Sequence, residues 1–224
     1  MTDTMDLDSA EKFRQLEQEL VAHAPEAIIF DCDGTLTHSM PHHYQTWRDI
    51  LEPLGVVFER ERFHALAGVP SDKIIALLSK EQGIELNFPT LVEAKEARFI
   101  QLLHLVEPIV PVVQLARDFH EKMPLAVASG GFRDIVLKQL DHLKITELFE
   151  AIVAAEDTEK HKPEPDVFLE AARRLSVAPE KCCVLEDSDL GIQAAERAKM
   201  SWVDVRPYYP VSYTHLTLPT RRGG

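Results

Sequence analysis

Short apolar runs without polar alternation recur along this chain of 224 residues, and they restrict its fold more than any other feature. They lie at 27–30, 125–128, 151–154, 182–185 and, more weakly, 202–205. Such runs are typical of strands buried on both faces of a parallel sheet. Helical patterns separate the later runs, at 135–143, 168–175 and 192–198. Strand alternating with helix predicts an α/β fold with a doubly wound parallel sheet.

The segment between the first and second runs is too long for a simple crossover. It contains apolar stripes at helical spacing, at 47–54, 74–78 and 92–103. We therefore expect an α-helical cap domain inserted at 38–106, with hinges near 37–40 and 107–111. The catalytic core then comprises 24–37 and 107–207. An N-terminal helical extension precedes the core at 1–23, with an amphipathic helix at 8–21. The tail at 211–224 has neither the helical nor the strand period of apolar residues and is interpreted as non-native.

The charge and the cysteines limit the class of protein. The net charge of −13 argues against a protein that binds DNA by neutralising phosphates, and against binding to acidic membrane surfaces. The three cysteines are odd in number and two are neighbours, which favours reduced thiols. We therefore expect a cytoplasmic protein that binds neither nucleic acid nor membranes. We also expect a monomer whose partner is a small molecule.

Polar residues follow the first four apolar runs directly. Since ligands bind beyond the carboxyl ends of parallel strands, these residues are expected to share one edge of the sheet. Singly, each group has an ordinary explanation as a turn, a helix start or a solvated loop. Together, at four strand ends, they favour a common site. The groups are Asp31-Cys32-Asp33-Gly34-Thr35, Ser129-Gly130-Gly131, the loop 156–164 with Lys160 and Lys162, and Glu186-Asp187-Ser188-Asp189.

These residue types suit phosphoryl transfer. A carboxylate such as Asp31 can attack phosphorus, and Asp33 can act as acid to the leaving oxygen and then as base to water. Asp31, Glu186 and Asp187 offer the hard oxygen ligands that suit Mg²⁺. Ser129, the amide groups after it and a lysine can hold the phosphoryl oxygens.

Four motifs together resemble those of the haloacid dehalogenase-like phosphohydrolase superfamily. They are FDCDGTL at 30–36, the Ser129 loop, KPEPDVF at 162–168 and LEDSDLGIQAA at 185–195. The insert, with Gly-Val at 68–69, is similar to that of the β-phosphoglucomutase-like branch. Within this branch the chain most resembles fructose-1-phosphate phosphatase-type sugar phosphatases. The resemblance implies a Rossmann-like core, a helical cap and Mg²⁺-dependent hydrolysis of small sugar phosphates through an aspartyl-phosphate.

The resemblance also implies a role for each motif residue. Asp31 is the nucleophile and Asp33 the acid and base. The Mg²⁺ ligands are Asp31, the Asp33 backbone carbonyl and Asp187, with Glu186 acting through water or from outside the ligand shell. The groups implied to hold the phosphoryl group are Ser129, Gly130 and Lys162.

For the residues of the insert, the resemblance implies fewer specific roles. His43 matches a histidine that contacts substrate in this branch, and the alternative is an ordinary surface histidine on the first cap helix. Trp47 is expected in the cap core rather than against a sugar. His38 stands at a position that is usually acidic in these enzymes.

Two positions distinguish a phosphatase from a phosphosugar mutase. Mutases of this branch have a lysine just before the glycine at 68 and an arginine three residues after it, for a second phosphate. Ala67 and Ser71 occupy those positions here, which favours a phosphatase over the alternative of a β-phosphoglucomutase-type phosphosugar mutase. The presence of Asp33 disfavours a dehalogenase, since that reaction has no leaving alkoxide to protonate.

Overall fold

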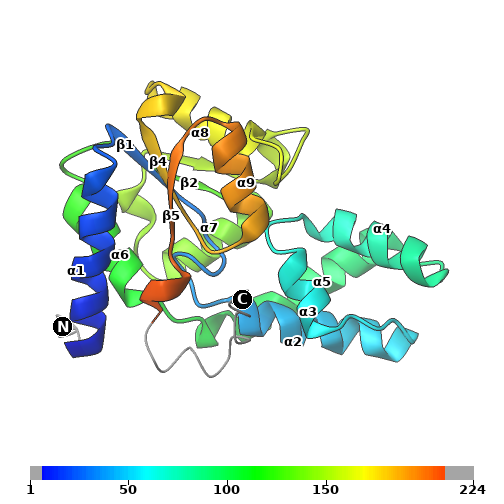
Figure 1. The fold of residues 1–224 in the computed structure, drawn as a ribbon. Coiled ribbons are helices and arrows are strands. Elements are labelled where there is room, and N and C mark those ends of the chain that lie inside the picture. Colours follow the sequence, from blue (N-terminus) through cyan, green and yellow to red (C-terminus); the bar gives the residue numbers. More distant parts are fainter. Residues whose placement is uncertain (1–6, 210–224) are drawn as a thin grey trace, which may run out of the picture.

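A computed structural model describes residues 7–209 and contains a five-stranded parallel sheet (Figure 1). The strand order is β3-β2-β1-β4-β5. The central strand β1 pairs with β2 and β4, so that Ile29 lies between Ala126 and Val184. This confirms the expected α/β class. The strands are β1 (Ala27–Phe30), β2 (Leu125–Ala128), β3 (Ala151–Val153), β4 (Cys182–Glu186) and β5 (Ser201–Asp204).

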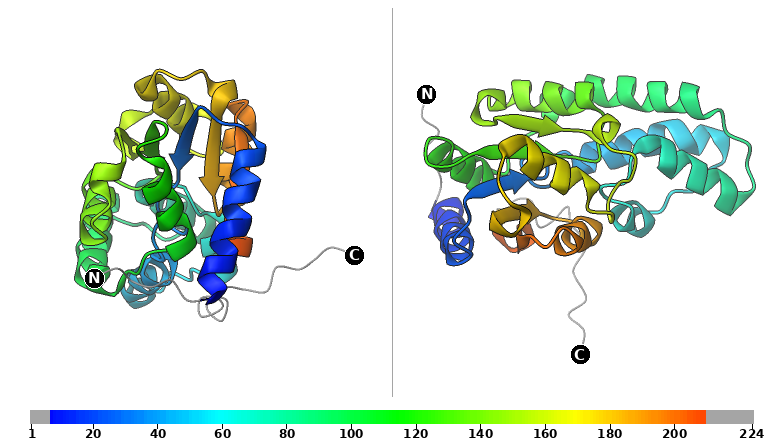
Figure 2. Two further views of the ribbon diagram at one scale, coloured as in Figure 1. Left: turned by 90° about the vertical axis from the view of Figure 1, so that its left-hand side faces the viewer. Right: turned by 90° about the horizontal axis from the view of Figure 1, so that it is seen from above.

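Helices cover both faces of the sheet, as Figure 2 shows for α6 and α7 on one side and α8 and α9 on the other. Alternate residues of β1 belong to two separate cores: Ile28 and Phe30 to one, Ala27 and Ile29 to the other. Burial on both faces explains why the strands are apolar throughout. The bounds are α6 (Val110–Phe119), α7 (Arg133–His142), α8 (Asp166–Leu175) and α9 (Asp189–Arg197).

The helix expected at 8–21 is α1 (Leu7–Ala22), which packs against α6. Its Leu16 and Leu20 are fully buried in the core on the α6 side of the sheet. The tail at 211–224 lies outside the described residues. Between residues 7 and 209, no helix is both long enough and apolar enough to cross a membrane.

Four helices form the insert between β1 and β2, beside the sheet in Figure 1. They enclose a small core of their own, in which Trp47 is 2% exposed, as expected for a cap-core residue. The short helix α3 had no apolar stripe to predict it. The helices are α2 (Met40–Leu51), α3 (Arg60–Ala65), α4 (Ser71–Gln82) and α5 (Phe88–Leu102).

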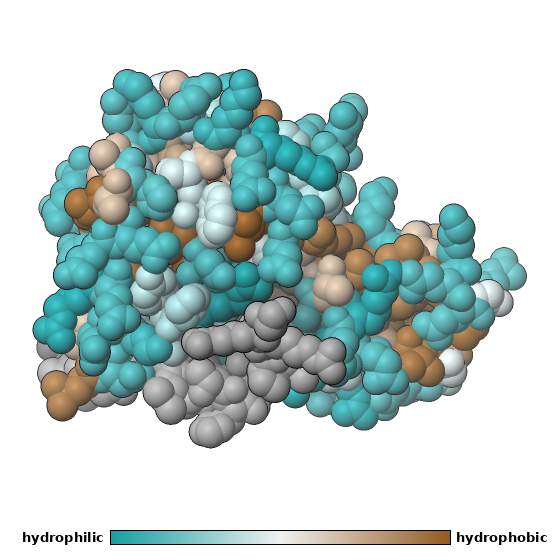
Figure 3. Space-filling model, viewed as in Figure 1, coloured by the Kyte–Doolittle hydropathy of each residue, from teal (hydrophilic) through white to brown (hydrophobic). Residues whose placement is uncertain are grey.

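Single 3₁₀ turns join several of these elements. They are η1 (Glu52–Leu54), η2 (Leu103–Leu105), η3 (Thr146–Leu148), η4 (Ala155–Asp157), η5 (Pro179–Lys181) and η6 (Arg206–Tyr208). The face in Figure 3 is mainly hydrophilic over the sheet and shows more hydrophobic residues over the insert. Leu54, Val57 and Phe88 of the insert are exposed. The short helices of the insert therefore enclose their apolar side chains less completely than the sheet does.

The two connections to the insert lie side by side. Thr37 forms an antiparallel bridge with Pro108, and the amide of His38 donates to the carbonyl oxygen of Glu107 at 2.8 Å. The second connection is shorter than the expected segment 107–111, because α6 already begins at Val110, with Pro111 in its first turn, a position that proline favours. The insert thus leaves and rejoins the core at one point.

Candidate functional site

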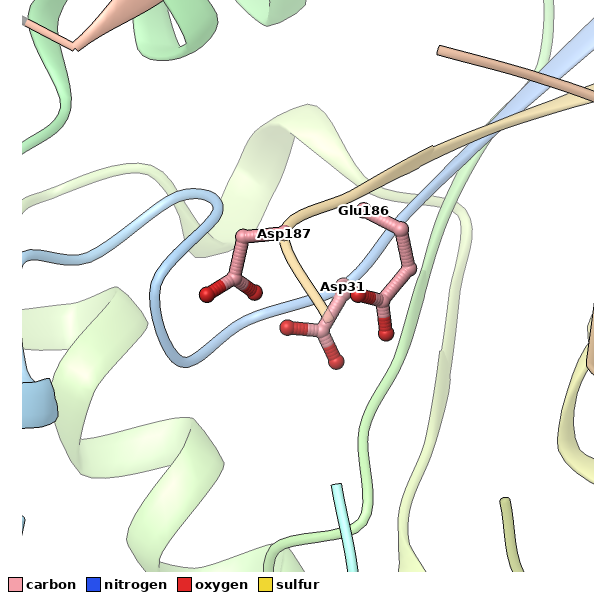
Figure 4. Close-up of side chains that lie close together, drawn as sticks. All are labelled: Asp31, Glu186 and Asp187. Atoms are coloured by element: carbon pink, nitrogen blue, oxygen red, sulfur yellow. The ribbon is translucent and has the colours of Figure 1, made fainter. Parts of the chain in front are cut away.

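Three carboxylates converge where β1 and β4 end, as Figure 4 shows. One oxygen each from Asp31, Glu186 and Asp187 lies within 4.8 Å of the others. Asp31 directly follows β1, while Glu186 ends β4 and Asp187 follows it. Because β1 and β4 are parallel neighbours, their carboxyl ends bring these residues together.

Lys162 lies between two of these carboxylates. Its Nζ donates to Asp31 Oδ1 at 2.6 Å and to Glu186 Oε1 at 2.7 Å, and its side chain is fully buried. Pro163 follows Lys162 but does not begin the next helix, since α8 begins at Asp166. Lys162 therefore reaches the site from a loop, whereas Lys160 in the same loop is exposed.

Glu186 and Asp187 are held by further contacts. The second oxygen of Glu186, Oε2, accepts a hydrogen bond from the amide of Ser188 at 2.6 Å. Thr35 Oγ1 donates to Asp187 at 3.3 Å. Gly34 has a φ of 89°, and a Cβ at this position would lie 2.1 Å from Asp187, so the turn after Asp33 requires glycine.

The charges in this cluster suit a divalent cation. Burial raises the pKa of Asp31 to about 7; Lys162 opposes this effect, and the Glu186 carboxylate adds to it. Burial, together with the negative charges of Glu186 and Asp31, raises the pKa of Asp187 well above its usual value. Two buried carboxylates and a partly buried one, with a single lysine, leave an excess of negative charge, and all the possible ligand atoms are hard oxygens. The residues therefore fit Mg²⁺.

Asp33 is held on one oxygen by three donors. Its Oδ1 accepts from Ser39 Oγ at 2.6 Å, His43 Nε2 at 2.9 Å and Gln139 Nε2 at 3.0 Å. Burial alone would raise the pKa of Asp33, but attraction to His43 and these hydrogen bonds outweigh it and hold that pKa well below its usual value. Asp33 is therefore an ionised carboxylate in this arrangement.

His43 is not an ordinary surface histidine. The residue is 7% exposed, and its ring stacks on Phe99 with centroids 3.8 Å apart and an interplanar angle of 6°. Its Nε2 faces Asp33, so the first helix of the insert contacts the loop after β1. The surface alternative is thus wrong.

The loop after β2 faces the insert. Ser129 is buried, and its hydroxyl oxygen accepts a hydrogen bond from the amide of Gly131 at 3.0 Å. A Cβ at Gly130 would lie 2.1 Å from the carbonyl oxygen of Gly68, and one at Gly68 would lie 3.0 Å from Lys162. The insert therefore touches the Ser129 loop backbone to backbone.

A cavity of about 70 Å³ lies between the insert and the sheet. The sheet side contributes Asp31, Asp33, Ser129, Gly130, Glu186 and Asp187, while the insert contributes His43, Ala67, Gly68, Ser71, Lys95 and Glu96. The expected site residues other than Lys162 thus line this cavity directly, and Lys162 contacts two of them. Sites for small molecules typically measure about 300–1,000 Å³.

Comparison with known proteins assigns the chain to a protein family. A sequence model of the family described as haloacid dehalogenase-like hydrolase matches residues 28–205. The chain belongs to this family. The expectation of a haloacid dehalogenase-like enzyme is therefore confirmed.

The similar proteins within the haloacid dehalogenase-like family agree with the expected branch. The fructose-1-phosphate phosphatase YqaB of Escherichia coli (strain K12) is 39% identical over 180 residues, covering 80% of this chain and 95% of that protein. The β-phosphoglucomutase of Bacillus subtilis (strain 168) is 29% identical, covering 83% and 85%. The crystal structure of a hydrolase from Pseudomonas syringae superposes with a TM-score of 0.74 at 26% identity, covering 85% and 90%.

Several residues of this haloacid dehalogenase-like site were not foreseen. Gln139 is fully buried although it lies among the apolar residues of α7, and a polar residue on a buried helix face was the one available signal. Lys95 carries the same signal, as a charged residue on the buried face of α5. Tyr209, whose hydroxyl donates to the carbonyl oxygen of Gly34, gave no local signal, because the two lie 175 positions apart. The further unforeseen residues are Ser39 and Glu96.

Proposed function

We propose that this enzyme hydrolyses small sugar phosphate monoesters through an aspartyl-phosphate on Asp31, with Mg²⁺ as cofactor. The observation that best supports this function is the cluster of Asp31, Glu186 and Asp187 with the buried Lys162, beneath a cavity that the insert covers. The name of the Escherichia coli relative supports a sugar phosphate as substrate.

The cation would be held by Asp31, Asp187 and the backbone carbonyl of Asp33. When bound, it supplies the positive charge that lets an anionic phosphate approach a carboxylate. Glu186 would act through a water molecule, since its two oxygens already accept hydrogen bonds from Lys162 and Ser188.

The reaction needs two steps at phosphorus. A carboxylate oxygen of Asp31 forms a bond to phosphorus, and the bond from phosphorus to the sugar oxygen breaks. Asp33 has to carry a proton before this step, which it takes from water in the preceding turnover or from the solvent, and it gives that proton to the sugar oxygen. Water then attacks the phosphorus of the aspartyl-phosphate, and Asp33 takes a proton from it, releasing phosphate and restoring Asp31. The three hydrogen bonds to Asp33 favour its carboxylate form, which is the form that accepts the proton of water.

Lys162, Ser129 and Gly130 would bind the phosphoryl oxygens during both steps. Lys162 is already beside Asp31, and Ser129 lines the same cavity. His43 would contact the substrate from the insert while it orients Asp33. Ala67 and Ser71, which line the cavity from the insert, supply no cation for a second phosphate, so the acceptor is water rather than a second sugar.

We further propose that residues 38–106 move as a cap over a core of 24–37 and 107–207. The cavity of about 70 Å³ is far smaller than a sugar phosphate site requires, so the cap has to open to admit substrate. The paired connections at Thr37 and Pro108 are the expected pivot. In this proposal the enzyme is a cytoplasmic monomer: both walls of the cavity come from one chain, and the three cysteines are buried free thiols.

The decisive test replaces Asp31 with asparagine. Asp31→Asn keeps the shape of the side chain but removes the nucleophile and a Mg²⁺ ligand. We expect release of phosphate from fructose 1-phosphate to fall at least about a thousandfold, with an unchanged circular dichroism spectrum. EDTA should abolish wild-type turnover, and added Mg²⁺ should restore it.

Two results would overturn the proposal. The first is substantial turnover by the asparagine variant in saturating Mg²⁺. The second is rapid interconversion of β-glucose 1-phosphate and glucose 6-phosphate by the wild type, followed by phosphorus NMR, without comparable release of phosphate.

A further inference from the structure

Helix α5 presents two adjacent charged residues to the cavity, Lys95 and Glu96. Their side chains are 6% and 14% exposed, so both charges are largely withdrawn from water. They lie on the insert side, opposite the carboxylates of the sheet. Buried charges are costly unless they are paired, so their partners decide what this wall can bind.

Glu96 is held as an oriented anion. Ser71 Oγ donates to Glu96 Oε1 at 2.8 Å, and Lys95 Nζ lies 3.1 and 3.2 Å from the two carboxylate oxygens. Ser71 stands where mutases of this branch have an arginine. Where those mutases have the positive charge of an arginine, this chain therefore has a carboxylate that accepts a hydrogen bond from a hydroxyl group.

The charge of Lys95 is already engaged. Besides Glu96, its ammonium group lies 5.6 Å from the ring centroids of both Trp47 and Phe99. Among the described residues that line the cavity, Lys95 alone has an ammonium or guanidinium group. The insert wall thus has no unpaired ammonium or guanidinium group to offer a second phosphate.

A fixed carboxylate at this place discriminates between substrates. Its oxygens accept hydrogen bonds from hydroxyl groups, and hydrogen bonds to a charged acceptor are the stronger kind. The same charge repels a phosphate, and water exclusion strengthens that repulsion. Specificity of this type rests on a repulsive element as well as an attractive one.

We propose that Glu96 is a specificity-determining residue: it binds the hydroxyl groups at the far end of a sugar monophosphate and excludes sugar bisphosphates. The proposal rests on the function proposed above, since it concerns the part of the substrate that is not transferred. Lys95 and Ser71 act through Glu96, by holding its carboxylate toward the cavity.

The test compares fructose 1-phosphate with fructose 1,6-bisphosphate in the full chain with Mg²⁺. Glu96→Gln removes the charge and keeps the shape. We expect the ratio of kcat/KM for the bisphosphate to that for the monophosphate to rise about tenfold or more, mainly through a lower KM for the bisphosphate. Glu96→Ala should raise the same ratio and, in addition, raise the KM for the monophosphate, because it removes the acceptor as well.

Glu93→Gln is the matched control, because Glu93 is an exposed residue of the same helix outside the cavity lining. It should leave both kcat/KM values unchanged. An unchanged ratio in the two folded Glu96 variants overturns this inference alone. If the wild type releases no phosphate from either sugar or from para-nitrophenyl phosphate, the proposed phosphatase function fails instead.

Discussion

Lys162 is fully buried, and its ammonium group lies between Asp31 and Glu186. Burial on its own lowers the pKa of a lysine, but the two carboxylates outweigh burial and raise the pKa of Lys162 above its usual value. The lysine is therefore charged over the whole working range of pH. Lys160, two residues earlier, is exposed, which makes the two lysines a matched pair.

We predict that Lys162→Ala lowers kcat/KM at least about a hundredfold, because it removes a charged donor from the transferring phosphoryl group. It should also destabilise the fold by about 3–5 kcal/mol, since it leaves buried carboxylates without their partner. Lys160→Ala should change activity less than about twofold. The measurement is steady-state phosphate release per folded molecule, with folding followed by circular dichroism. Equal losses in the two variants would contradict the assigned role of Lys162.

At the scale of the elements, the insert and the Ser129 loop touch at the edge of the cavity, which Gly68 and Gly130 both line. The loop at Gly68, before α4, and the loop at Gly130, after β2, meet through backbone atoms. Since the obstructing atom at Gly130 would be a carbonyl oxygen rather than a flexible side chain, no rotamer change can relieve a clash there. The Ser129 loop and the Gly68 loop can approach this closely only because residue 130 has no Cβ.

We predict that Gly130→Ala prevents full closure of the cap. Gly130 does not have a positive φ, so alanine suits the local backbone and the fold should persist. We expect kcat/KM for fructose 1-phosphate to fall about a hundredfold, because a cap held open admits water and misplaces the groups that it contributes. Protease cleavage near 37–40 should become faster. Full activity with wild-type protease resistance would show that closure does not depend on this contact.

At the scale of the whole molecule, several buried ionisable groups affect stability in opposite directions. The pKa of Asp31 rises from 3.8 to about 7, so between these values the folded protein holds a proton that the unfolded chain has lost. Stability therefore falls as the pH rises through this window, and the raised pKa of Asp187 acts in the same direction. Burial lowers the pKa values of His38, His42 and His64, which has the opposite effect below pH 6.5.

The change in stability on adding Mg²⁺ should report on the carboxylates and not on the histidines. Mg²⁺ bound as proposed would compete with protons for the ionised carboxylates, so its effect on stability should grow with pH. We predict that millimolar Mg²⁺ raises the Tm more at pH 8 than at pH 5, as measured by scanning calorimetry. Asp187→Asn should remove most of this gain. An equal gain at both pH values, or one that survives in the variant, would place the cation elsewhere.

The fold class and the residues at the strand ends could be predicted because both depend on local pattern. A strand covered on two faces must be apolar at every position, as Ile28 and Ile29 are, and a parallel sheet must bring its carboxyl ends to one edge. Asp31 and Asp187, beyond neighbouring strands, could thus be assigned to one site from their positions alone.

The tertiary structure alone decided which polar side chains meet. The bonds from Gln139 to Asp33, from Tyr209 to Gly34 and from Ser71 to Glu96 join residues that are 106, 175 and 25 positions apart. Hydropathy periodicity reports which face of an element is buried, but a hydrogen bond needs two atoms about 3 Å apart in a fitting direction. That condition depends on how separate elements pack, so the charge state of Asp33 and the oriented carboxylate of Glu96 became apparent only in the folded molecule.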